Sequence, residues 1–447
     1  MTSSTSTLAL HRWVARAVPV TPAELSALLW SFAYFFSLLA GYYVLRPLRD
    51  QMGIAGGVRN LPWMFTATFV VLLLAQPLYG ALVARLPRAR FIPFVYHFFV
   101  ANLALFWLLL TLHIATVEVA RTFFVWVSVF NLFAIAVFWS FMADIFTSEQ
   151  GKRLFGFIGA GGTAGALLGP VITIWLSVPL GPVNLLIVAV AFLEFAVLCA
   201  HRLEKAALAG GHVPEKPRVE AVPSAEAEEA RIGGSAFAAI AEVFGEPYLL
   251  GVAVWVSLMS FGGTFLYYQQ ANIVSATIHD PAQQTRLFAG IDLAVGLLTL
   301  ATQSFATGRL LKRFGVAPAA AALPAVYIVA FTVLALVPGL AAVVFFQTIQ
   351  RMMNFAISNP ARQVFFTVVS REAKYKAKNL IDVVLFRGSD ALYGWLFDSL
   401  QVLGLKLAAI AACAVPVALG WFALSMALGR TQERRAALIA PEPVEGD

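Results

Sequence analysis

The chain has 447 residues, of which 60% are apolar and only 12% are charged, about half the charged fraction of an ordinary soluble protein. Its two cysteines, Cys199 and Cys413, both lie in apolar runs, which excludes a disulfide framework and a cysteine metal site. The net charge of +7 does not point to nucleic acid, because lysine and arginine gather in the cytoplasmic loops of membrane proteins. The composition therefore predicts a protein of the lipid bilayer.

Twelve stretches are long and apolar enough to span a membrane, which takes about 20 residues. They cover residues 24–45, 61–84, 91–112, 117–145, 154–178, 183–201, 248–273, 286–307, 317–337, 339–360, 379–403 and 406–428. A polar stretch rich in proline, glycine and acids separates the sixth from the seventh, which is typical of a linker. We therefore expect an all-α polytopic membrane protein with two six-helix halves, divided into 1–201, a cytoplasmic linker 202–246, 247–430 and a cytoplasmic tail 431–447.

Basic residues gather in every second loop, which sets the expected orientation. The basic loops hold Arg85, Arg88 and Arg90; Lys152 and Arg153; Arg309, Lys312 and Arg313; and Arg371, Lys374, Lys376 and Lys378. Because such loops face the cytoplasm, both termini are predicted to be cytoplasmic, in a multi-pass protein of a bacterial inner membrane. The connection between the first two helices is the exception, because it is expected outside and yet carries Arg46, Arg49 and Arg59.

A short motif recurs after the second helix of each half. "GALVARLPRAR" begins at Gly80 and includes Arg85, and "GRLLKRFG" begins at Gly308 and includes Arg313. The glycine is expected to let two helices approach, and the arginines to cap helix ends. The pair resembles the loop motif of the major facilitator superfamily. That resemblance implies a solute site at mid-membrane between two six-helix halves.

The fifth predicted helix contains "GAGGTAGALLGP", in which Gly161, Gly165 and Gly169 recur every four residues. No strand precedes this stretch and no Gly-Lys-Ser/Thr ends it, so it is not a nucleotide-binding loop. Small residues on one face predict close packing of two helices in lipid.

Charged side chains inside a span are costly, so they usually face a partner or a cavity. Such residues and their polar neighbours are Glu194; Asp292; Gln347, Arg351, Asn354 and Ser358; and Asp382, Arg387 and Asp390. The spacings from 347 to 358 place that set on one helix face. Arg351 either contacts a solute or is locked to Asp390 or Asp292. Glu194 stands alone among apolar neighbours, and with Asp292 it is a candidate for carrying a coupling ion.

Three stretches resemble the nucleotide (ATP/ADP) translocases of plastids and intracellular bacteria. They are "YYVLRPLRDQM" from Tyr42, "FWSFMADIFTSEQGKRLFGFIGAGGTAGALLGP" from Phe138 and "EAKYKAKNLIDVVLFRG" from Glu372. The second contains Glu149, Lys152 and Arg153 in the order that the family uses. The resemblance implies a transporter of nucleotides or other phosphorylated metabolites.

The family's binding residues carry over only in part. The basic residue before Asp50 is kept as Arg49, and Arg387 is kept in the eleventh helix. The family has a glutamate in the fourth helix where this chain has Asn131, and a lysine where this chain has Asp390. Because the charge at that position is reversed, exchange of ATP for ADP does not follow from the resemblance.

Arginine suits the binding of phosphate or carboxylate, because its planar fork makes two parallel hydrogen bonds. We therefore expect a binding site for a small anionic solute. Its candidate residues are Arg46, Arg49, Asp50, Asn131, Arg351, Asn354, Arg387 and Asp390. The competing interpretation of the first three is a salt-bridged gate between the first and seventh helices.

The function predicted is secondary active transport of an organic anion by alternating access, by a monomer in the bilayer. The alternative is a major facilitator antiporter that exports amphiphilic small molecules. A membrane enzyme would need a His/Asp/Ser cluster or metal ligands near the interface, and the sequence has neither. We expect no cofactor, no metal and no nucleic-acid partner.

Overall fold

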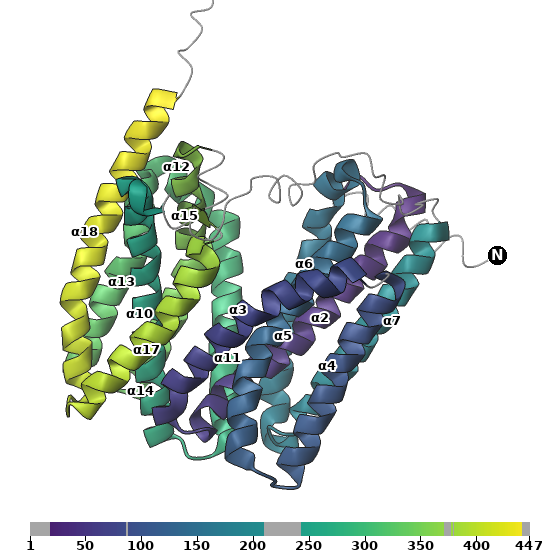
Figure 1. Cartoon of the computed structure of the whole chain (residues 1–447), viewed down its shortest axis with the longest axis horizontal. Coiled ribbons are helices and arrows are strands. Elements are labelled where there is room, and N and C mark those ends of the chain that lie inside the picture. The colour runs from purple at the N-terminus through teal and green to yellow at the C-terminus, as the bar shows by residue number, and fades with distance from the viewer. Residues whose placement is uncertain (1–17, 86–87, 210–242, 371–376, 379, 440–447) are drawn as a thin grey trace, which may run out of the picture. The chain divides into compact units, whose positions relative to one another are not determined.

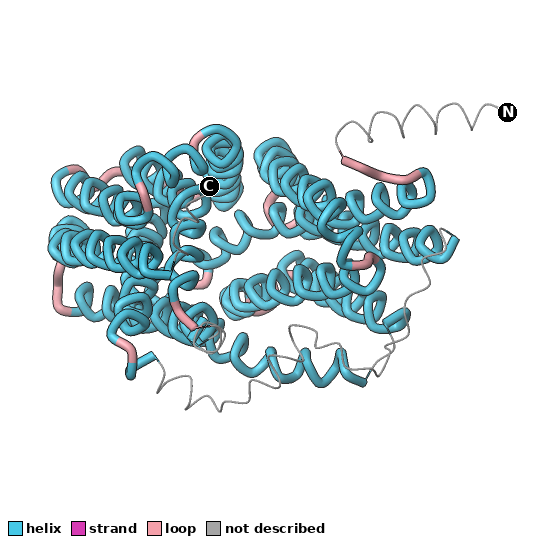
Figure 2. The backbone as a smooth tube through the Cα atoms, turned by 90° about the horizontal axis from the view of Figure 1, so that it is seen from above, coloured by secondary structure: helices cyan, strands magenta, loops and turns pink. Residues whose placement is uncertain are grey.

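The structure, a computed structural model, describes residues 18–85, 88–209, 243–370, 377–378 and 380–439. These residues form helices joined by short loops, and no strand occurs among them (Figures 1 and 2). The first helices are α2 (Pro22–Ala55), α3 (Leu61–Arg85), α4 (Arg88–Thr111), α5 (Thr116–Ile145), α6 (Ser148–Leu180) and α7 (Leu185–Ala209), with a 3₁₀ turn η1 (Val58–Asn60) before α3. The prediction of an all-α polytopic membrane protein is confirmed.

The later part of the chain is more interrupted. Its elements are α10 (Pro247–Thr277), α11 (Pro281–Phe305), α12 (Thr307–Phe314), α13 (Val316–Leu336), α14 (Leu340–Met353), π-helical η2 (Asn354–Ser358), α15 (Asn359–Phe365), 3₁₀ turn η3 (Phe366–Val368), π-helical η4 (Leu380–Leu385), α17 (Phe386–Val402) and α18 (Leu407–Ile439). In the described residues, eleven helices are long and apolar enough to cross a membrane. The twelfth expected span, 379–403, is formed by η4 and α17, and α17 has only 17 residues.

The chain divides into two compact units. The first consists of Met1–Gly56, Val70–Glu220 and His279–Leu293, and the second of Gly57–Phe69, Ala221–Ile278 and Ala294–Asp447. In the first unit α2 packs on α5, α6 and α7, and in the second α13 packs on α18 and α10 on α17. Each unit is discontinuous in sequence, because α3 and α11 contribute to both.

The first helix differs from its prediction. It was expected to end near residue 45, but α2 continues through Pro47 to Ala55. Proline usually ends or kinks a helix, but here the helix continues and buries Leu48 and Met52 beyond it. Arg46 and Arg49 therefore lie within a helix, and the connection to α3 keeps only Arg59 of the three arginines assigned to it.

The glycine stripe of α6 packs against α2, as its spacing predicts. A Cβ atom on Gly161 would lie 2.6 Å from the carbonyl oxygen of Phe32, and one on Gly169 would lie 2.7 Å from that of Ala40. Cβ atoms in proteins essentially never make contacts this short. The backbones of α2 and α6 therefore contact each other at these glycines, which have no Cβ. The helix pair is thereby held at a separation that only glycine permits.

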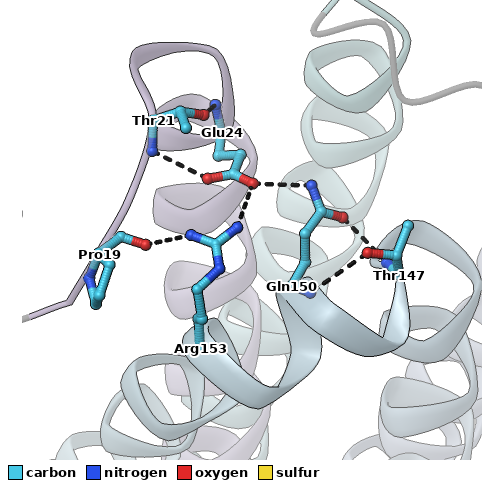
Figure 3. Close-up of polar contacts among 6 residues, drawn as sticks. All are labelled: Pro19, Thr21, Glu24, Thr147, Gln150 and Arg153. Carbon is cyan, nitrogen blue, oxygen red and sulfur yellow. Dashed lines mark hydrogen bonds and ion pairs between the residues drawn. The ribbon is translucent and has the colours of Figure 1, made fainter.

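Two capping boxes at the starts of α2 and α6 are joined by one glutamate (Figure 3). Glu24 accepts a hydrogen bond from the Thr21 amide at 2.9 Å and from the side-chain amide of Gln150 at 2.9 Å. The guanidinium of Arg153 donates to the same carboxylate at 3.0 Å. Glu24 is only 5% exposed, so this contact ties the two helix starts together in a poorly solvated place.

Replacing the arginine of this contact should destabilise the first unit. Arg153→Ala leaves a buried carboxylate with one donor fewer, which typically costs about 1–3 kcal/mol. The matched control is Lys152→Ala, since Lys152 is exposed one residue earlier and should change stability by no more than about 0.5 kcal/mol. Thermal unfolding in detergent measures both. Equal effects of the two substitutions would show that the Arg153–Glu24 contact contributes nothing particular.

Candidate functional site

The first unit contains an ion pair between α2 and α11. The Nε atom of Arg46 in α2 lies 3.8 Å from a carboxylate oxygen of Asp292 in α11. The side chains are 18% and 1% exposed respectively. Arg46 also lies over the ring of Tyr43, with 5.6 Å between the guanidinium carbon and the ring centroid. The sequence analysis selected both residues as candidates, Arg46 for solute binding and Asp292 for ion coupling, but did not predict that they contact each other.

Arg49 lies on the next turn of α2 and is held mainly by an aromatic ring. Its guanidinium carbon is 4.3 Å from the ring centroid of Phe124 in α5, and its Nη1 lies 3.8 Å from a carboxylate oxygen of Asp50. The side chain is 20% exposed, and its Nε has no hydrogen-bond partner among the described residues. A planar cation stacked on a ring keeps the edge of its fork available.

Neither arginine makes a direct hydrogen bond to its carboxylate neighbour. Both N···O distances are 3.8 Å, whereas a charge-assisted N–H···O bond measures about 2.7–2.9 Å. The guanidiniums of Arg46 and Arg49 are thus electrostatically balanced but keep donors that these carboxylates do not use. Asn131 of α5 is also in this unit, and its Oδ1 has no hydrogen-bond partner in the described chain.

The Arg46–Asp292 contact should show in stability. Arg46→Ala leaves the nearly inaccessible carboxylate of Asp292 without this guanidinium, and breaking a buried pair in this way costs about 3–5 kcal/mol. Arg46→Ala combined with Asp292→Asn removes both charges and should restore much of the loss. Thermal unfolding of the single and double variants measures the coupling. Additive losses in the double variant would mean that the two charges do not interact.

The second unit holds a different polar group around Asp390 of α17. Ser260 and Thr264 of α10 donate hydrogen bonds to one carboxylate oxygen, at 2.5 and 3.3 Å. Arg387 lies 3.6 Å from the other oxygen, as their shared helix face predicts. The sequence interpretation missed Ser260 and Thr264, although their spacing of four places both on one face of α10.

The tenth predicted helix is not a regular α-helix throughout. Asn354–Ser358 is π-helical, and the extra residue in such a turn rotates the residues that follow it by about 100°. Ser358 is the last residue of this segment, so its alignment with Arg351 and Asn354 stays a prediction. Beyond it, Arg362 lies 3.4 Å from Asp382, a contact that the sequence interpretation did not include.

Glu194 has a polar partner, although its neighbours in the sequence are apolar. The Nε2 atom of His97 in α4 lies 3.6 Å from the carboxylate of Glu194 in α7. The other ring nitrogen of His97 is 2.7 Å from the carbonyl oxygen of Pro93. Both side chains are about half exposed, so this pair lies on the surface of the first unit and not in its core.

The repeated loop motif is only partly described. Gly80 lies in α3, and the side chain of Arg85 is outside the described residues. In the second copy Gly308 lies near the start of α12, and no atom lies within 4 Å of a Cβ built on it. Among the described residues, no helix therefore makes the expected close approach to Gly308. Arg313 is exposed beside the ring of Phe314.

The junction motif of α6 separates into two kinds of residue. Glu149 and Lys152 are exposed, whereas Arg153 contacts Glu24 of α2. Among the described residues, no group of three or more His, Cys, Asp or Glu side chains is placed to hold a metal ion.

Comparison with known proteins identifies the fold. The family model "Major Facilitator Superfamily" matches residues 25–377. A bacterial homologue of the human lysosomal transporter Spinster has a TM-score of 0.53 at 16% identity, covering 95% of this chain and all of that chain. A bacterial homologue of the iron transporter ferroportin gives 0.62 at 10% identity, covering 90% and 98%. The nucleoside transporter NupG gives 0.55 at 15% identity, covering 92% and 99%. No curated protein matched the chain by sequence.

Proposed function

Because the chain belongs to the Major Facilitator Superfamily, we propose that it is a secondary active transporter that moves an organic anion by alternating access. One observation carries the proposal. Arg46 and Arg49 lie in a membrane-spanning helix with side chains only 18% and 20% exposed. Ionisable residues inside a span are expensive, and they are retained where they serve transport.

The loose contacts of the two arginines support binding of an anion. A phosphate or carboxylate can accept hydrogen bonds from the donors of Arg46 and Arg49 that Asp292 and Asp50 do not use, because neither pair is a direct hydrogen bond at 3.8 Å. The solute then gains two-point hydrogen bonds from a planar fork. When no solute is bound, the two carboxylates balance the charge of the arginines.

The proposed substrates are nucleotides and other phosphorylated metabolites. This narrower proposal rests on the arginines of α2 and on the resemblance of three stretches to the nucleotide translocases. The second unit would contribute Arg351, Asn354, Arg387 and Asp390. Asn131 completes the set in the first unit, and Asp292 and Glu194 remain the candidates for ion coupling.

Export of amphiphilic molecules is the alternative, and the aromatic residues do not favour it. In the first unit Phe99 of α4 contacts Phe130 of α5 with 5.0 Å between ring centroids, and Phe130 is fully buried. In the second unit Trp255, also fully buried, contacts Phe365 and Trp421. These rings hold helices together within each unit.

We further propose that the transporter lies in a bacterial inner membrane as a monomer, with both termini in the cytoplasm. Support comes from the charge of the loops. Moving Arg46 and Arg49 from a loop into α2 strengthens this orientation, because one arginine, Arg59, is left as an exception.

A ligand panel tests the proposal. The purified protein is unfolded thermally in the presence of nucleotides, sugar phosphates, dicarboxylates and hydrophobic cations, and compounds that stabilise it are then tested by counterflow in proteoliposomes. A ligand at 100 times its Kd stabilises the folded state by about 2.7 kcal/mol. We expect stabilisation and counterflow with a phosphorylated anion. Stabilisation by hydrophobic cations, with none by any anion, would favour the exporter.

A further inference from the structure

The second unit has a cavity at one end that the proposed transport site does not use. It is an open surface pocket with a volume of about 430 Å³. Its wall comes from η1, from the last turns of α10 and from the turn between α17 and α18. The side chains of Arg59, Asn272, Gln401 and Lys406 line it.

The wall of this cavity is fixed by hydrogen bonds. Gly404 has φ +87°, a left-handed conformation that glycine adopts without strain. Its amide donates to the carbonyl of Gln401 at 2.9 Å, which closes the turn that brings Lys406 to the rim. The side-chain amide of Gln401 donates to Asn272 at 3.3 Å, and that of Gln269 donates to the Leu407 carbonyl at 2.8 Å. These contacts join α17 and α18 to α10.

The charge of the cavity is entirely positive. Arg59 and Lys406 both line it and are both exposed, and none of its lining residues is acidic. Within the described chain, neither side chain takes part in an ion pair. Two cations that line one pocket repel each other, and a bound anion relieves that repulsion.

Arg59 also lacks an explanation from topology. After α2 takes up Arg46 and Arg49, Arg59 is the arginine that remains in the connection between the first two spans. The loop-charge bias disfavours a positive residue there if the termini are cytoplasmic. A role in binding accounts for its position.

We propose that this cavity binds an anionic group, a phosphate or a carboxylate, between Arg59 and Lys406. The side-chain amides of Asn272 and Gln401 each donate one hydrogen within the protein, to Tyr268 and to Asn272, and each has a second hydrogen for the anion. The start of the 33-residue helix α18 adds a weak positive potential. The anion comes either from a soluble solute or from the headgroup of an anionic lipid. The site is built from the second unit alone and does not depend on Arg46 or Arg49.

Protection of Lys406 from an amine-acylating reagent tests the site directly. The full chain is labelled in phosphatidylcholine nanodiscs, and the rate at Lys406 is read by peptide mass spectrometry. Exposed Lys312 of α12 serves as the internal reference. One arm adds inorganic phosphate at constant ionic strength. A second arm omits phosphate and replaces part of the phosphatidylcholine with phosphatidylglycerol.

At phosphate ten times its Kd, labelling of Lys406 should slow about tenfold, while Lys312 is unaffected. Protection in the phosphate arm identifies a soluble anion, and protection in the phosphatidylglycerol arm identifies a lipid headgroup. Arg59→Gln should abolish the protection, and Arg286→Gln, which alters an exposed arginine of the first unit, should keep it. Arg49→Ala should also keep it, so that failure of the proposed transport site leaves this result standing. Unprotected Lys406 in both arms, or protection that survives Arg59→Gln, would overturn the proposal.

Discussion

Gly165→Leu is expected to abolish the folded, monodisperse protein. A Cβ at this position would overlap the carbonyl oxygen of Phe36 and lie 2.9 Å from the amide nitrogen of Ala40. Both atoms are backbone of α2, which cannot give way as a flexible side chain would. Overpacking in a core commonly costs about 1–3 kcal/mol, and here four heavy atoms must enter a helix contact that has no room for one.

The same helix supplies a matched control. No atom lies within 4 Å of a Cβ built on Gly159, so Gly159→Ala should leave the protein folded, while Gly165→Ala should already destabilise it. Size-exclusion chromatography and thermal unfolding in detergent compare the two alanines and the leucine. If Gly165→Leu behaved like the wild type, the packing of α6 on α2 would be wrong.

The sequence predicted those parts of the fold that depend on local patterns. The apolar spans and the glycine stripe are local, since Gly161, Gly165 and Gly169 share a helix face wherever the helix lies. The end of the first helix was missed because the predicted span ended where the charged residues begin at Arg46, whereas α2 continues to Ala55. The capping boxes beginning at Thr21 and Thr147 could be predicted from their spacing. The contact by which Glu24 joins the two boxes could not, because it depends on how α2 packs against α6.

The candidate site was predictable in residue type more than in partners. Arg46 and Asp292 are conspicuous as charges inside spans, yet their pairing depends on α11 reaching α2, which no local pattern reports. The π-helical Asn354–Ser358 could not be predicted from the polar spacing, which assumes a regular helix. The hydroxyls of Ser260 and Thr264 gained their meaning only when α10 packed on α17 beside Asp390.

Arg49→Ala is expected to abolish uptake of the anion. Truncating one side of a buried charge contact loses about 2–5 kcal/mol, which weakens binding by a factor of roughly 30 to several thousand. Part of the loss comes from Phe124, whose ring holds the guanidinium at 4.3 Å. The folded protein should persist, because Arg49 makes no hydrogen bond to Asp50.

Arg49→Lys separates charge from geometry. Lysine keeps the positive charge but has no planar fork, so it can neither stack on Phe124 as guanidinium does nor bind a phosphate at two points. We expect partial recovery of uptake. Full recovery would mean that a positive potential is sufficient at this position, without two-point recognition.

Equilibrium binding and counterflow, measured on one preparation of Arg49→Ala with the anion that most stabilises the wild type, test the central claim most directly. Binding by filtration on the purified protein does not require the two units to rearrange, whereas counterflow in proteoliposomes does. If Arg49 binds the solute, both are lost together. If Arg49→Ala binds the anion as tightly as the wild type while counterflow fails, Arg49 is part of a gate and the binding assignment is wrong.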